Sequence, residues 1–308
     1  MKCHILILFL LSALLNSCSS YKFANKHVSR KLEKSHLELH TAELEKYTVN
    51  YWDSGGEKPA LIMLHGFGTA TQFNWYKQVA ALKNYRVILP NLLYFGGTVP
   101  KIPSHSVADQ VKTIQALVKH LGVTHYYLCG ISYGGLVAAE LALAEPIKVK
   151  KLALFDAPVK YLKEEDLLPV YQQLRIKHSW DLLVPTDYKM LKNLMNIALK
   201  HPPMIPGILF KDVYNNLYVE HAENQRELLN TLESERPLYE SREYNYKFPV
   251  LLLWGEEDRL IPKHVGIDLQ KHIGKNARLK IIPNTAHMPN IEEPKKFNKI
   301  LLEFLNET

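Results

Sequence analysis

The spacing of apolar residues changes several times along the chain, and each spacing predicts a different element. Residues 37–40 and 47–52 alternate apolar with polar positions, which predicts two half-buried antiparallel strands. Residues 60–64 are apolar throughout, as in a strand that is covered on both faces. Short apolar runs of the same kind predict further buried strands at residues 86–90, 126–128, 149–155, 249–254 and 279–282.

Segments with helical periodicity separate these strands. In residues 108–121 the apolar side chains recur every three or four positions and share one face, and Gly122 follows as a helix cap. Helices are also predicted at residues 75–82, 136–142 and 297–304. Strands that alternate with helices at this spacing predict a mostly parallel central sheet flanked by helices, which is the α/β class.

The alternation stops between residues 159 and 247. This stretch mixes Leu, Met and aromatic residues with charges, has a helical apolar stripe at residues 191–198, and is broken by a Pro-rich turn at 201–207. We expect a helical cap that lies over the ends of the sheet, where ligands bind in such folds. The sequence thus predicts a core in two parts, residues 37–158 and 248–308, with the cap 159–247 between them.

The first 36 residues precede this pattern. Residues 1–17 combine Lys2 with an apolar run at residues 5–15, which is too short to span a bilayer and is typical of a signal peptide. The run ends in Leu-Asn-Ser-Cys, which resembles the lipobox of bacterial lipoproteins. The resemblance implies that Cys18 is lipidated and that the protein is exported and anchored to a membrane of the bacterial cell envelope. Residues 18–36 are polar and basic, which predicts a tether.

Two alternatives to lipidation remain open for this N-terminal segment. An ordinary cleaved signal peptide would give a secreted or periplasmic soluble protein, and an uncleaved segment would act as an anchor by itself.

Composition and charge narrow the range of functions. The 308 residues are 47% hydrophobic and carry a net charge of +7, but Lys and Arg are scattered among acids, so no basic stripe predicts nucleic-acid binding. The three cysteines, Cys3, Cys18 and Cys129, lack the spacing of a zinc site and are too few for a disulfide scaffold. Cys129 lies in a predicted buried strand and is expected to be an inert core thiol. No metal or other cofactor is implied.

The strongest candidate for chemistry is Ser132, in the motif G-x-S-x-G at residues 130–134. The motif lies between a predicted strand and a predicted helix. A serine on such a sharp turn needs small residues two positions to either side, because the chains pass closely there, and Gly130 and Gly134 meet this need. The turn exposes the hydroxyl near the positive end of the new helix. A plain Gly/Ser turn is the alternative interpretation.

A second motif, His65-Gly66-Phe67-Gly68, follows the strand at residues 60–64. Its glycines let the backbone bend so that the N–H of Phe67 points at a developing oxyanion, and the N–H of Tyr133 is the expected second donor. For the side chain of His65 we favour a structural role, in which the ring ties the loop down.

A serine hydroxyl needs a base within hydrogen-bond reach, and the base needs an acid that holds its tautomer. His287 follows the last predicted strand and is the expected base. The acid is expected on the loop after the preceding strand, which reads Gly255-Glu256-Glu257-Asp258. Asp156, which ends the strand after the nucleophile, is the competitor for this role.

These motifs, in this order and each at the carboxyl end of a predicted strand, resemble those of the α/β-hydrolase fold superfamily from about residue 37 to the C-terminus. The resemblance implies an α/β-hydrolase fold with a helical cap, and its G-x-x-D spacing selects Asp258 over Glu256 and Glu257. Members that cleave epoxides or carbon–halogen bonds carry Asp at the position of Ser132, so the serine favours acyl transfer. We expect Ser132, His287 and Asp258 to act as a triad through an acyl-enzyme.

The residues from Trp75 to Gly97 look like those of lipase-like and monoacylglycerol-lipase-like members, and an apolar cap favours an apolar acyl group. We therefore expect a lipase-like carboxylic ester hydrolase that acts on small-molecule esters or lipids. The alternatives are a thioesterase, an amidase, a C–C bond hydrolase, or a non-hydrolytic ligand-binding receptor of the same fold. A structural or adhesion lipoprotein is a further hypothesis, but it would have no use for the triad. The oligomeric state and the physiological substrate are not predicted.

Overall fold

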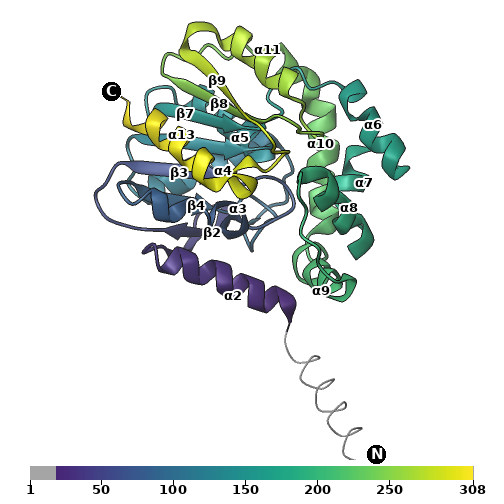
Figure 1. The fold of residues 1–308 in the computed structure, drawn as a ribbon. Helices are drawn as coiled ribbons and strands as arrows, with labels where there is room; N and C mark the ends of the chain where they lie inside the picture. Colours follow the sequence, from purple (N-terminus) through teal and green to yellow (C-terminus); the bar gives the residue numbers. More distant parts are fainter. Residues whose placement is uncertain (1–18, 308) are drawn as a thin grey trace, which may run out of the picture.

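The centre of the molecule is a nine-stranded sheet, seen in the computed structural model, which describes residues 19–307 (Figure 1). The strands follow the order β1-β2-β4-β3-β6-β7-β8-β9, and β5 pairs with β2. Pairing is antiparallel from β1 to β4 and parallel from β4 to β9, which confirms the α/β class. The strands are β1 (Glu38–Glu43), β2 (Tyr47–Asp53), β3 (Ala60–Leu64), β4 (Arg86–Pro90), β5 (Val99–Pro100), β6 (Tyr126–Ile131), β7 (Val149–Phe155), β8 (Val250–Gly255) and β9 (Ala277–Ile282).

Helices cover both faces of the sheet, and a separate apolar cluster is buried under each layer. Along β3, Ile62 and Leu64 join one cluster, whereas Leu61 and Met63 join the other, because successive strand residues point to opposite faces. This explains the uninterrupted apolar run in the sequence. One face is covered by α4 (Val107–His120), α5 (Tyr133–Ala144) and α11 (Lys263–Ile273), and the other by α3 (Thr71–Trp75) and α13 (Pro294–Asn306).

The prediction of a helix at residues 75–82 is wrong in its bounds. The structure has α3, which ends at Trp75, and then a short 3₁₀ turn, η1 (Val79–Ala81). Between them Gln78 is buried, and its side-chain amide donates to the carbonyl of Asn290 at 2.8 Å. A tertiary hydrogen bond thus outweighs the local helical periodicity. The remaining short elements are η2 (Gly274–Asn276) and α12 (Pro289–Glu292).

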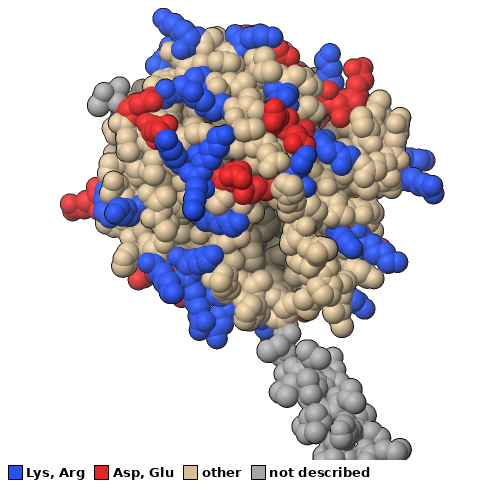
Figure 2. Space-filling view, viewed as in Figure 1, with Lys and Arg blue, Asp and Glu red and all other residues tan. Residues whose placement is uncertain are grey.

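The segment between β7 and β8 contains helices and no strand, as predicted for the cap. In Figure 1 these helices lie together on one side of the core. The face shown in Figure 2 is hollowed between the core and the cap, and there Lys and Arg are interspersed with Asp and Glu rather than gathered in a stripe. The cap helices are α6 (Glu164–Leu174), α7 (Ser179–Leu183), α8 (Tyr188–Ala198), α9 (Gly207–Leu217) and α10 (Ala222–Ser241).

Residues 18–36 were expected as a tether, but the structure has helix α2 (Ser20–Glu33) there, packed on the core. Val28 and Leu32 are four positions apart, share one face of this helix and are buried. The hydroxyl of Ser19 accepts from the N–H of Lys22 and caps the helix. The segment is polar on average, so these two apolar positions did not predict a buried helix face.

The predicted signal peptide and Cys18 lie outside the described residues. Within residues 19–307, every helix is too short or too polar to cross a bilayer.

Candidate active site

Ser132 lies on the turn between β6 and α5, with φ 53° and ψ −127°. This backbone conformation is strained for a residue with a side chain. Close packing explains the glycines beside it: a Cβ on Gly130 would lie 2.3 Å from the carbonyl oxygen of Gly134, and one on Gly134 would lie 2.2 Å from that of His65. The strand, the new helix and the loop after β3 therefore meet at a distance that only glycine permits.

The loop at residues 65–68 passes directly beside the serine. A Cβ on Gly66 would be 3.2 Å from the Cβ of Ser132, and the rings of Phe67 and Tyr133 pack edge to face with centroids 5.7 Å apart. Neither the N–H of Phe67 nor that of Tyr133 donates to a protein acceptor within residues 19–307. Both predicted donors are therefore available to an oxygen atom of a ligand.

The ring of His65 is fully buried and holds this loop in place. The N–H of Leu92 donates to Nε2 at 2.9 Å, so the ring proton is on Nδ1, which donates to the carbonyl of Gly66 at 2.7 Å. Burial lowers the pKa of His65 from 6.5 to about 4. The geometry agrees with the structural role that the sequence favoured for this side chain.

The low pKa of His65 predicts that the protein loses stability in mild acid. Between pH 6.5 and about pH 4 the unfolded chain binds a proton at this residue and the folded chain does not, so the free energy of unfolding falls as the pH falls. The loss attributable to this residue is about 3 kcal/mol. Urea unfolding at pH 7 and pH 4.5 should show a smaller pH effect in His65→Gln than in the wild type. An equal pH effect in both proteins would contradict the prediction.

His287 and Asp258 come together from the loops after β9 and β8. The Nδ1–H of His287 donates to Oδ2 of Asp258 at 2.8 Å, and both side chains are buried. The other carboxylate oxygen accepts from the backbone N–H of Leu260 at 2.8 Å and of Ile261 at 3.0 Å. With its proton held on Nδ1, the imidazole has Nε2 free to accept another.

Asp156, the competing acid, is buried beside this pair but has a different partner. One of its oxygens accepts from the N–H of Gly255 at 2.8 Å, and the other has no hydrogen-bond partner within residues 19–307. Burial and the negative charge of Asp258 raise its pKa well above the usual range of a carboxyl group. Burial therefore favours the neutral form of the Asp156 carboxyl group.

Oxygen atoms of Asp156 and Asp258 and a ring nitrogen of His287 lie within 4.8 Å of one another, a spacing that would suit a metal ion. The donor atoms do not fit one well. The Asp258 carboxylate already accepts three hydrogen bonds, and burial raises the pKa of Asp156, which disfavours the carboxylate form that a metal ion would bind. We interpret the group as the hydrogen-bonded pair of His287 and Asp258 with Asp156 buried beside it.

Gly255 ends β8, and the chain that carries His287 crosses it closely. A Cβ on Gly255 would lie 1.8 Å from the carbonyl oxygen of Ala286. Gly255→Ala is therefore expected to lower the free energy of unfolding by about 3 kcal/mol, because backbone must move to make room. Gly207→Ala is the matched control, since its Cβ would meet only a ring carbon of Tyr188 at 3.3 Å. Urea midpoints measure both, and equal stability of the two variants would refute the argument.

Two residues that support the site were missed by sequence reasoning. Asn74 accepts from the N–H of Gly66 at 3.0 Å and so positions the loop at residues 65–68. Glu292 accepts from the N–H of Ala286 at 2.7 Å, next to His287, and from that of Lys200 in the cap at 2.6 Å. Neither belongs to a motif, and only the tertiary contacts reveal them.

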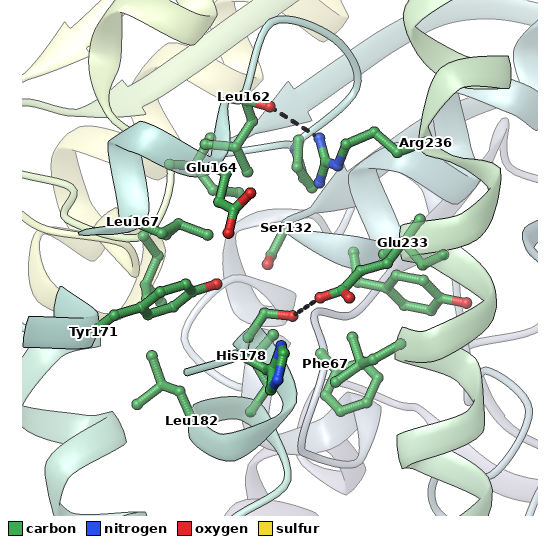
Figure 3. A pocket seen from close by; sticks show the side chains of 18 of the residues that line it. Phe67, Ser132, Leu162, Glu164, Leu167, Tyr171, His178, Leu182, Glu233 and Arg236 are labelled. Atoms are coloured by element: carbon green, nitrogen blue, oxygen red, sulfur yellow. Dashed lines mark hydrogen bonds between the residues drawn. The ribbon is translucent and has the colours of Figure 1, made fainter. Parts of the chain in front are cut away.

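A cavity of about 380 Å³ lies between the core and the cap, and Ser132 and His287 both line it. Within residues 19–307 no hydrogen bond joins the two side chains, a contact that often tightens only when substrate binds. In Figure 3 the Ser132 hydroxyl lies amid side chains from the cap helices. The apolar side chains of the lining are Phe67, Pro158, Leu162, Leu167, Leu182, Leu183, Leu229, Leu232, Leu260 and Ile261.

Polar groups lie at the cap side of the same cavity. The hydroxyl of Ser179 donates to Glu233 at 2.7 Å, and the guanidinium of Arg236 donates to the carbonyl of Leu162 at 3.0 Å (Figure 3). Glu164 on α6 also lines the cavity. The cap thus presents both apolar surface and charge to the serine, which the sequence alone could not place.

Comparison with known proteins identifies the family. The sequence profile of the α/β hydrolase fold matches two overlapping stretches, residues 59–186 and 172–294, which together cover more than half of the chain. The protein therefore belongs to the α/β-hydrolase fold family.

Its relatives include hydrolases with different substrates. The chain is 28% identical over 266 residues to the 2-hydroxy-6-oxononadienedioate/2-hydroxy-6-oxononatrienedioate hydrolase of Paraburkholderia phymatum, covering 84% of this chain and 91% of the relative. It is 26% identical to the monoacylglycerol lipase ABHD6 of Bos taurus, covering 81% and 76%. A solved membrane phospholipase A, a bacterial virulence factor, has a TM-score of 0.82 at 24% identity, covering 99% and 98%, and shows the shared fold. These relatives support a hydrolase activity without specifying the bond.

Proposed function

We propose that this protein is a serine hydrolase that cleaves carboxylic esters with apolar acyl groups. Ser132 attacks the ester carbonyl, His287 accepts its proton and returns it to the leaving alcohol, and Asp258 holds the imidazole in its tautomer. The N–H groups of Phe67 and Tyr133 stabilise the oxyanion. Water then releases the acid from the acyl-enzyme by the same path.

The observation that carries this proposal is the cavity. It reaches the Ser132 hydroxyl and the His287 ring, and leucine side chains from the cap and the adjoining loops are the most frequent residues in its remaining lining. An acyl chain buried there would gain about 0.8 kcal/mol per methylene group. Longer apolar acyl chains should therefore be preferred over shorter ones until the cavity is full.

The relative from Paraburkholderia favours a second candidate, C–C bond hydrolysis. The substrates in its name are dicarboxylates, which would bring two negative charges into the cavity. Lys163, Lys177 and Arg236 line it and could pair with them, but Glu164 and Glu233 line it as well. Arg236 is also engaged with a backbone carbonyl. This charge pattern supports an uncharged acyl chain better than a dicarboxylate.

The test is a substrate series on the full-length protein in detergent micelles. We expect p-nitrophenyl esters from acetate to palmitate to be hydrolysed with an optimum at intermediate chain length, and a 2-hydroxy-6-oxo dienedioate to be left intact. The reverse preference would establish the C–C hydrolase. No turnover of either, together with no labelling by a fluorophosphonate, would point to a non-hydrolytic ligand-binding protein.

We also propose that the protein is a lipoprotein of a bacterial cell envelope, exported by residues 1–17 and anchored through Cys18. The support is the sequence pattern alone. Metabolic labelling with an alkyne fatty acid should mark the wild type and not Cys18→Ser. Equal labelling of both proteins, or none in either, would reject the lipid anchor.

A further inference from the structure

The first described residues are held against the cap. The carboxylate of Asp212 on α9 accepts hydrogen bonds from the hydroxyls of Ser19 and Ser20, each at 2.8 Å, and from the N–H of Tyr21 at 2.7 Å. The hydroxyl of Ser20 also reaches the carbonyl of Leu209 at 3.2 Å. The N–H of Tyr21 and the hydroxyls lower the pKa of Asp212, so it stays charged and able to accept them. The chain therefore begins its described fold on α9, as Figure 1 shows.

Large apolar side chains are exposed around this junction. Phe23 in the first turn of α2 is 73% exposed, Ile208 and Leu209 in the first turn of α9 are 75% and 39% exposed, and Met204 just before α9 is fully exposed. We call these four residues the α2–α9 surface. Elsewhere in residues 19–307 exposed residues of this kind are scattered over separate elements. Figure 2 shows a mainly uncharged surface next to the point where the described chain begins.

The sequence before Ser19 leaves little distance between this surface and a membrane. A residue spans at most about 3.6 Å of extended chain. Cys18 directly precedes Ser19, and the apolar run ends at Leu15. If the chain is held by a lipid on Cys18, as proposed above, or by that run, the bilayer lies within a few residues of the Ser19–Asp212 contact. Since α2 is a docked helix, no tether is available to hold the enzyme away.

Charge around the junction suits an anionic bilayer. Lys22 and Lys26 on α2 and Lys211 on α9 are exposed, and they outnumber the two acids at this junction, Asp212 and Glu220. Basic residues beside exposed apolar ones are typical of segments that lie in the headgroup region of membranes containing anionic lipid.

We propose that the α2–α9 surface is buried in the headgroup region of an anionic bilayer, so that the cap itself rests on the membrane. At the other end of α9, the ring of Tyr218 lies against Gly68, beside the predicted oxyanion loop: a Cβ on Gly68 would be 3.3 Å from it. One helix thus connects the membrane-facing surface with the edge of the active site. The proposal concerns membrane contact and does not depend on which bond the enzyme cleaves.

The experiment measures membrane depth on the full-length protein. Ile208→Cys carries an NBD fluorophore, and the protein is reconstituted in vesicles of phosphatidylethanolamine and phosphatidylglycerol with spin-labelled lipids as quenchers. Ile147→Cys is the matched control, because Ile147 is 81% exposed and lies just before β7, at the edge of the sheet opposite Ser132. The wild type, labelled in parallel, gives the background from native cysteines, and Cys129 is buried.

We expect the probe at Ile208 to be blue-shifted and quenched several-fold more strongly than the probe at Ile147. Equal quenching at the two positions, or none at Ile208, would overturn the proposal. In detergent, a blue shift that grows with protein concentration, without quenching by spin-labelled lipid, would show that a second copy of the chain covers this surface. That result would also overturn the membrane proposal.

A second measurement links the surface to turnover. Ile208→Glu should slow the hydrolysis of an ester embedded in vesicles several-fold and leave the hydrolysis of a soluble short-chain ester unchanged, whereas Ile147→Glu should change neither. Equal slowing of both substrates by Ile208→Glu would indicate damage to the site rather than lost membrane contact. If the wild type cleaves no ester at all, the proposed function fails, while the quenching result still decides the membrane contact.

Discussion

Ser132→Ala is expected to lower kcat for a p-nitrophenyl ester by about 10⁵-fold, because the nucleophile of an acyl-enzyme mechanism has no substitute in the cavity. The turn should survive, since alanine is no larger than serine at this strained position. KM should change little, because the cavity lining stays the same. Stopped assays at high enzyme concentration, with fluorophosphonate labelling in parallel, measure the loss.

Ser179→Ala is the control that makes this result specific. Ser179 lines the same cavity, and its hydroxyl donates to Glu233 instead of facing a base. Its replacement should change kcat by only a few-fold. If Ser132→Ala kept most of the activity and Ser179→Ala lost it, the nucleophile would be misassigned.

Asp258→Asn is expected to cost about 10⁴-fold in kcat while the protein stays folded. The asparagine oxygen can still accept from the N–H groups of Leu260 and Ile261, so its amide group turns towards His287. An amide N–H facing Nδ1 forces the imidazole proton onto Nε2, and the ring can then no longer take a proton from Ser132. The loss comes from the wrong tautomer rather than from a disturbed fold.

Asp156→Asn provides the matched comparison for this variant. Burial already favours the neutral form of Asp156, and an asparagine oxygen can accept from the N–H of Gly255 as the carboxyl group does. Activity should therefore fall by less than about tenfold. Urea unfolding of both variants separates lost catalysis from lost stability. A large loss in Asp156→Asn with a small one in Asp258→Asn would make Asp156 the acid of the triad.

The sequence led to Ser132, His287 and the loop that carries Asp258 because each follows a strand that can be recognised from its own residues, and the family resemblance then selected Asp258 within that loop. In the structure β6, β8 and β9 are parallel, so their carboxyl ends meet at one edge of the sheet. The sequence left Asp156 as a competitor, because both acids follow buried strands. Only the packing of the loops shows that His287 hydrogen-bonds to Asp258 and that Asp156 faces Gly255 instead.

The cap and the N-terminal helix were predictable to a smaller degree. Helical content and the break before α9 follow from local periodicity, but which side chains face Ser132 depends on how the five cap helices dock on the core. The prediction of a tether was wrong for residues 20–33, because two buried apolar residues contribute little to the average hydropathy of a polar segment.

The sequence by itself determined the α/β class, the helical nature of the cap and the turn that carries Ser132, since strand period, helix period and glycine sterics act over a few neighbouring residues. The tertiary structure alone decided which acid meets His287, which groups line the cavity, and that the first described residues dock on α9. These features depend on contacts such as that of Ser20 with Asp212, which are 192 positions apart. Contacts of that range depend on how whole helices and loops pack, and a local pattern of residues does not encode them.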